Sequence, residues 1–65
     1  MQHKIKVTIK RSIFGVVLWE VIKVTEFNRS ERLELIHQGV SFKNAIIKAM
    51  ENRDHKTPVI LEISG

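Results

Sequence analysis

The sequence predicts a small α+β fold in which one amphipathic helix packs on one face of a mainly antiparallel sheet. Three observations predict it. Residues 3–10 alternate between apolar and polar side chains, residues 12–27 are dense in β-branched residues, and residues 42–53 repeat apolar side chains at three- and four-residue spacing. The first two patterns are typical of strands, and the third is typical of a helix with one buried side. A helix laid across one sheet is the simplest packing that buries one face of each.

Residues 3–10 form the first expected strand. Successive side chains of a strand point to opposite faces, so this segment has one apolar face and one face rich in lysine. We expect the apolar face to be buried and the lysine-rich face to meet solvent. Residues 10–12 are then expected to connect this strand to the next one as an antiparallel hairpin. The apolar side chains are Ile5, Val7 and Ile9, and the polar ones are Lys4, Lys6, Thr8 and Lys10.

The second expected strand lies within SIFGVVLWEVIKVTEF, residues 12–27. Its unbroken apolar part runs only from Ile13 to Trp19, whereas a membrane-spanning helix needs about 20 predominantly apolar residues. Its many Val and Ile residues favour a strand, and we expect no membrane segment. Gly15 is expected to form a bulge or a close approach near the start of this strand. Both faces of the strand are apolar, so the face without the helix needs a loop, a second copy of the chain or a partner to cover it.

The segment that follows residue 31 fits two structures. Leu33 and Leu35 alternate as in a strand, whereas Leu33, Ile36 and Val40 have the spacing of a short helix capped by Ser30. Periodicity resolves such short apolar runs poorly, and we favour the strand. The expected order of elements is therefore β-β-β-α-β, with β-β-α-α-β as the alternative.

Residues 42–53 are the clearest helix of the chain. Ser41 is a good N-cap, and Pro58 prevents the helix from continuing. Residues 59–63 read VILEI and are expected to form a terminal strand. The apolar stripe of the helix consists of Phe42, Ala45, Ile46, Ala49 and Met50, of which Ala45, Ile46 and Ala49 are expected to face the sheet.

Composition narrows the class of protein. The 65 residues are expected to form one domain, residues 1–65, and they include no cysteine, which excludes a disulfide framework and a cysteine-based zinc site. The N-terminal residues MQHKIKV lack the apolar core of a secretion signal, so we expect a cytoplasmic protein. A net charge of +4 fits either nucleic acid or an acidic protein as partner.

Residue types needed for catalysis are sparse. There is no Gly-rich phosphate loop, and the three histidines, His3, His37 and His55, lie in different elements without the spacing of metal ligands. Glu20 and Glu62 could face each other across strands, but a glutamate in a half-exposed strand is usually a solvent-side residue. We therefore expect no enzymatic activity, no metal and no cofactor.

Two surfaces are candidates for binding a partner. A tryptophan surrounded by valines is a typical anchor of protein interfaces, whereas a tryptophan rimmed by lysines could stack bases and hold phosphates. A tryptophan that simply fills the core is the alternative to both. The protein-binding surface would consist of Val17, Trp19 and Val21, and the nucleic-acid-binding surface of Lys4, Lys6, Lys10 and Trp19.

The stretch HQGVSFKNAIIKAMENRDHKTPVILEISG, residues 37–65, resembles the C-terminal part of very small phage-encoded host-interaction proteins such as the Dmd antitoxin of T-even phages. The likeness lies in chain length, in the order of elements and in the AIIKAM pattern of the helix, and it identifies no functional residue. It implies a protein that binds and blocks a bacterial toxin or another host factor. We therefore expect a small non-enzymatic binding protein that masks a protein partner or forms a homodimer, with a nucleic-acid-binding module as the alternative.

Overall fold

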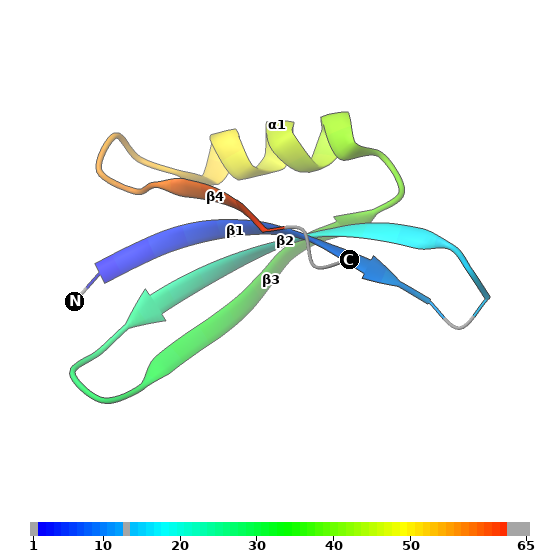
Figure 1. Cartoon of the computed structure of the whole chain (residues 1–65). Helices are drawn as coiled ribbons and strands as arrows, with labels where there is room; N and C mark the ends of the chain where they lie inside the picture. Colours follow the sequence, from blue (N-terminus) through cyan, green and yellow to red (C-terminus); the bar gives the residue numbers. More distant parts are fainter. Residues whose placement is uncertain (1, 13, 63–65) are drawn as a thin grey trace.

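The computed structural model describes residues 2–12 and 14–62 and has the predicted α+β fold (Figure 1). Its elements are β1 (Gln2–Arg11), β2 (Val17–Glu26), β3 (Glu31–Gly39), α1 (Phe42–Asn52) and β4 (Val59–Glu62). The strands lie side by side in the order β3-β2-β1-β4. The β1–β2 and β2–β3 pairs are antiparallel, and β4 runs parallel to β1. The order β-β-β-α-β is thus confirmed, and the alternative with a second helix is excluded because β3 is a strand.

The loop between β1 and β2 includes apolar residues that the sequence pattern had assigned to a strand. The Ser12 amide donates to the Val16 carbonyl (2.8 Å), and the Gly15 amide donates to the Ser12 carbonyl (3.0 Å). Gly15 has a φ of 79°, the left-handed conformation that glycine adopts readily and that often closes short hairpin loops through a glycine bulge. The expected bulge therefore lies in the loop, and β2 begins only at Val17. Phe14 is 85% exposed, while Ile13, also assigned to the strand, lies outside the described residues.

The pairing register assigns every side chain of the sheet to one of two faces. Val7 lies opposite Val21, and Lys6 lies opposite Ile22. The covered face, named for the helix that packs on it, includes Ile5, Val7, Ile9, Val17, Trp19 and Val21. The open face includes Lys4, Lys6, Thr8 and Lys10 of β1, Leu18, Glu20, Ile22, Val24 and Glu26 of β2, Glu31, Leu33 and Leu35 of β3, and Ile60 and Glu62 of β4.

Helix α1 packs on the covered face through two alanines. Ala45 and Ala49 are fully buried against Ile5, Val7 and Val21, because their small side chains allow the helix to approach the sheet closely. Burial of each of the larger side chains, Ile5, Val7 and Val21, contributes about 1.5–3 kcal/mol. Partly buried apolar side chains surround the cluster: Trp19, Ile36, Ile46 and Val59.

The ends of α1 follow from local hydrogen bonds. The Ser41 hydroxyl accepts from the Asn44 amide (3.2 Å) and caps the N-terminus as predicted. The helix ends at Asn52, one residue before the predicted end, and the chain then returns towards the sheet. The Ile5 amide donates to the Pro58 carbonyl (2.9 Å), which aligns β4 beside β1. The terminal strand is confirmed for residues 59–62, while residue 63 lies outside the described residues.

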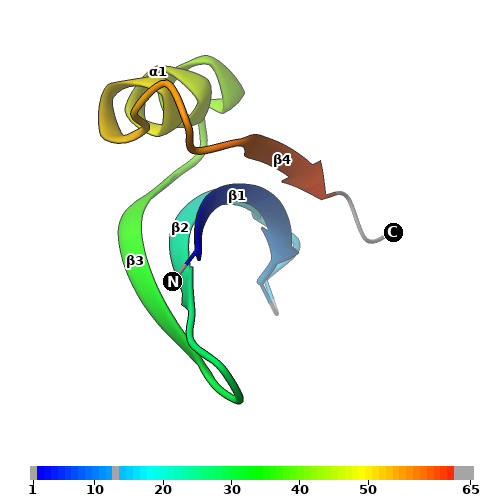
Figure 2. The ribbon, with the colours of Figure 1, turned by 90° about the vertical axis from the view of Figure 1, so that its left-hand side faces the viewer.

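The sheet is strongly coiled. Figure 2 shows that β1 and β2 curl so that the helix lies on their convex side and the open face is concave. Curling explains why Val24 is fully buried although it belongs to the open face and lies outside the core cluster. Lys4 lies directly opposite Val24, and its ion pair with Glu26 (2.8 Å) holds its aliphatic stem beside that valine.

No helix in residues 2–12 and 14–62 combines the length and the apolar character that crossing a bilayer would require. The only helix described there, α1, has 11 residues and carries charged residues on the side that faces away from the sheet.

The packing of α1 predicts different effects for substitutions at two neighbouring isoleucines. Ile46 packs against the core cluster, whereas Ile47 is 44% exposed. Ile46→Asp places an unpaired charge in the helix–sheet contact, where desolvation is very costly. A domain of this size has only a few kcal/mol of net stability, so we expect Ile46→Asp to abolish the cooperative thermal transition measured by circular dichroism. Ile47→Asp is the matched control and should melt within a few degrees of the wild type; an Ile46→Asp protein that melts equally well would contradict this placement of the helix.

Candidate functional site

The surface predicted for protein binding, Val17, Trp19 and Val21, belongs to the covered face. Val21 is fully buried beneath the helix. The ring of Trp19 packs against the core, with its centroid 4.5 Å from that of Phe42 and the two planes tilted by 52°. A partner-binding surface made of these residues requires them to lie on the face without the helix. They lie on the face that the helix covers, and this expectation is corrected. The sequence could not decide this point because both faces of β2 are apolar.

The predicted platform for nucleic acid is not assembled in the described structure. Lys4, Lys6 and Lys10 lie on the open face, and Trp19 lies on the opposite, covered face. A base stacked on the Trp19 ring would be separated from the lysines by the sheet itself. The expected surface that combines Trp19 with the lysines is therefore corrected: the tryptophan and the lysines lie on opposite faces of the sheet.

Carboxylates balance the lysines of the open face. Lys4 pairs with Glu26 at 2.8 Å, and Lys6 pairs with Glu62 at 3.4 Å. The open face as a whole has three lysines and four glutamates, so the excess positive charge of the chain lies elsewhere. The lysines of this face therefore do not form a basic cluster without nearby acidic groups.

An apolar patch lies beside these charges. Ile22 and Leu35 are opposite each other across β2 and β3, and Leu33 lies opposite the buried Val24. Leu33 and Leu35 are 61% and 55% exposed. We call Ile22, Leu33 and Leu35 the open-face patch; within residues 2–12 and 14–62, no element packs on it. Adjacent exposed leucines on one sheet face are unusual outside binding surfaces. The alternation of Leu33 and Leu35 in the sequence indicates that they share a face, and it identifies this patch once the face covered by the helix is known.

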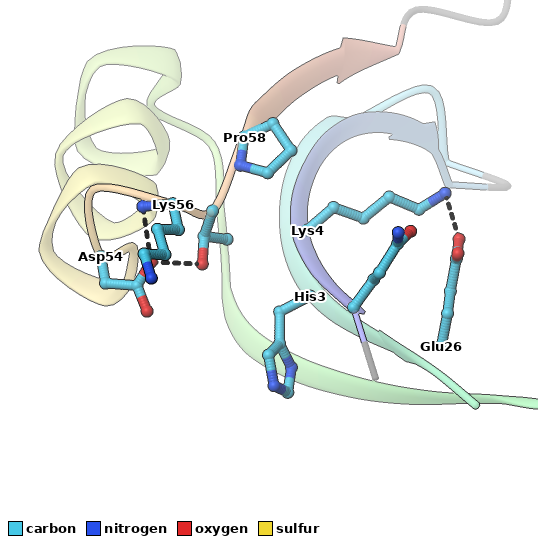
Figure 3. A pocket seen from close by; sticks show the side chains of 8 residues that line it. His3, Lys4, Glu26, Asp54, Lys56 and Pro58 are labelled. Carbon is cyan, nitrogen blue, oxygen red and sulfur yellow. Dashed lines mark hydrogen bonds and ion pairs between the residues drawn. The ribbon is translucent and has the colours of Figure 1, made fainter.

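A shallow depression of about 590 Å³ lies at the N-terminal end of β1 (Figure 3). It is bordered by the Lys4–Glu26 ion pair on one side and by the connection from α1 to β4 on the other. The Asp54 carboxylate there accepts hydrogen bonds from the Lys56 amide (2.9 Å) and the Thr57 hydroxyl (2.8 Å). The Lys4, Glu26 and Asp54 side chains are thus engaged in structural contacts. The described part of the chain holds no group of three or more potential metal ligands.

Three groups near this depression have shifted pKa values. The hydrogen bond from the Lys4 ammonium lowers the pKa of Glu26, and the same contact raises the pKa of Lys4. Hydrogen bonds from the Thr57 hydroxyl and the Lys56 amide lower the pKa of Asp54. These interactions stabilise the charged forms of the three groups, so they connect the stability of this end of the sheet to pH.

Comparison of the chain with known protein families, with curated proteins and with solved structures gives no match. The geometry of the open-face patch and its surrounding charges is therefore the main basis for a functional conclusion.

The shifted pKa values predict how stability depends on pH. Glu26 and Asp54 have lowered pKa values, so their contribution is present above about pH 4.5 and is lost as the pH falls through those lowered values. Lys4 has a raised pKa, so its contribution is complete below about pH 10 and is lost as the pH rises through the raised value. We expect Glu26→Gln to reduce the loss of unfolding free energy between about pH 5 and pH 2, measured by urea denaturation. Glu51→Gln is the control, because its pair with Lys48 is long (3.9 Å) and exposed; an equal effect of both variants would contradict this assignment.

Proposed function

We propose that this chain is a small non-enzymatic binding protein that masks a protein partner through its open face. The exposure of the open-face patch carries this proposal. Leu33 and Leu35 lie side by side on a concave sheet face that no described element covers. Exposed leucine side chains contribute most to the free energy of binding when a partner excludes water from them. The partner surface is therefore assigned to the open-face patch in place of Val17, Trp19 and Val21.

The charge pattern favours a protein over nucleic acid as the partner. Glu26 and Glu62 already neutralise two of the three open-face lysines. Phosphate binding would have to break these pairs and act against the two remaining glutamates. A protein surface with apolar side chains and mixed charges complements this face better. The nucleic-acid-binding module is accordingly the second candidate, and the same experiment tests it.

The class of partner follows from the resemblance of residues 37–65 to small phage-encoded host-interaction proteins. That resemblance implies a bacterial toxin or another host factor, which the chain would block by covering a functional surface. A concave apolar face suits this role because it can enclose a protruding element of the partner, such as a loop or a helix end. Inhibition would then need no chemistry from the chain itself.

The proposal predicts that a single substitution in the open-face patch prevents capture of the partner. Leu35→Lys places a charge at the centre of the contact, so we expect at least a tenfold loss of affinity, about 1.4 kcal/mol or more. Leu61→Lys is the matched control, because Leu61 is similarly exposed (51%) but belongs to the covered side of β4. The measurement is affinity capture from bacterial lysate with and without nuclease treatment, followed by titration of the captured protein with each variant.

The expected result is one captured protein that binds the wild type and Leu61→Lys but not Leu35→Lys. Binding that disappears after nuclease treatment, or that falls steeply with salt in the presence of an oligonucleotide, would favour the nucleic-acid-binding module instead. Equal binding by both variants would contradict the assignment to the open-face patch.

A further inference from the structure

Among the strands that the structure describes, none pairs with the outer edge of β3. β3 is the last strand on its side of the sheet and has nine residues, whereas β4 on the opposite side has four (Figure 1). No proline interrupts Glu31–Gly39, and no element of the described residues pairs with its outer side. Natural proteins usually shorten, charge or cover such an edge, because its free backbone groups can pair with another strand.

The hydrogen-bond alternation shows which backbone groups are directed outwards. The Phe27 amide donates to the Ser30 carbonyl (2.8 Å) at the β2–β3 turn. In an antiparallel pair, hydrogen-bonded and non-hydrogen-bonded positions alternate. Arg32 and Glu34 are therefore hydrogen-bonded to β2, and the backbone groups of residues 31, 33 and 35 point to the free edge. The regular edge ends there, because the register shifts between Val21 and Ile22 and leaves a bulge in β3.

The charges along this edge are self-complementary in one register. If a second copy pairs antiparallel with its Leu33 opposite Leu33, Arg32 of each copy lies opposite Glu34 of the other. Those two residues occupy non-hydrogen-bonded positions, where side chains come closest across the strands. Centring the pair on Glu34 instead would place two glutamates opposite each other, and centring it on Leu35 would bring the bulge into the ladder.

We propose that two copies of this chain associate by antiparallel pairing of residues 31–35 about Leu33. The two-fold axis is perpendicular to the sheet, so both helices lie on the same side and the two open faces become continuous. Two Arg32–Glu34 pairs form on the covered side. On the open side the two Leu33 side chains meet, and Leu35 of each copy lies opposite Glu31 of the other. Five residues per copy make a small interface, so this dimer is a weak one.

Charge substitutions test this register directly. Arg32 and Glu34 are exposed and lie outside the open-face patch. Arg32→Glu places two pairs of glutamates opposite each other in its own dimer, and Glu34→Arg places two pairs of arginines opposite each other. An equimolar mixture of the two variants restores both opposite-charge pairs. We expect each variant alone to dimerise at least about tenfold more weakly than the wild type and the mixture to recover wild-type affinity.

The measurement is sedimentation equilibrium at low salt and at protein concentrations up to about 0.5 mM, because weak interfaces require high concentration. Circular dichroism of each variant establishes that it is folded. A wild type that stays monomeric throughout this range would overturn the proposal. A mixture that associates no better than the separate variants would overturn it as well.

A backbone substitution gives a second test that does not depend on charge. The Leu33 amide points outwards, so Leu33→Pro removes no hydrogen bond within the sheet, and proline is tolerated at such edge positions. Leu33→Ala is the matched control, because it shortens the side chain but keeps the amide. We expect Leu33→Pro to prevent dimerisation and Leu33→Ala to retain a measurable part of it. Dimerisation of Leu33→Pro at wild-type affinity would overturn the pairing about Leu33.

Discussion

The contact of Ala45 and Ala49 with Ile5, Val7 and Val21 is the interaction on which the rest of the structure depends. All five side chains are fully buried. One helix of 11 residues covers one face of a sheet and no more, so this contact decides which apolar side chains become core. It places Trp19 beneath the start of the helix, where the Phe42 ring packs against it. Among the described residues, no element packs on the opposite face, where Val24 is fully buried while Leu33 and Leu35 are exposed.

The same constraint explains which parts of the fold could be predicted from the sequence. The period-two pattern of β1 and the three- and four-residue spacing of α1 are local, and both elements formed as expected. The choice between the two faces of β2 is not local, because it depends on the side to which the chain crosses after β3. A crossover between parallel strands has a preferred hand, but this rule can be applied only once β4 is known to pair with β1.

Two other differences between prediction and structure have separate causes, the first local and the second not. The residues around Gly15 looked like the beginning of a strand because they are apolar, yet the hydrogen bonds of Ser12 and the left-handed glycine make them a hairpin loop. The open-face patch was missed for a different reason. Leu33 and Leu35 were read as evidence for a strand, and nothing in their spacing indicates whether the face that they share is covered.

The functional proposals depend on the same division between faces. Carboxylates on the open face balance its lysines, and the remaining apolar patch adjoins the unpaired edge of β3. A partner that covers the patch contacts its side chains, whereas a second copy pairs with the edge mainly through backbone groups and the Arg32 and Glu34 charges on the covered side. The two proposed interfaces meet at Leu33, which belongs to both.

The central claim is that α1 covers the face carrying Val7, Trp19 and Val21. Nuclear Overhauser contacts between side-chain protons measure this most directly. The account predicts cross-peaks between the Trp19 and Phe42 rings, whose centroids lie 4.5 Å apart, and between the Ala45 and Ala49 methyl groups and the covered-face valines. Cross-peaks from those alanine methyl groups to Ile22 or Leu35, with none to Val7 or Val21, would contradict it.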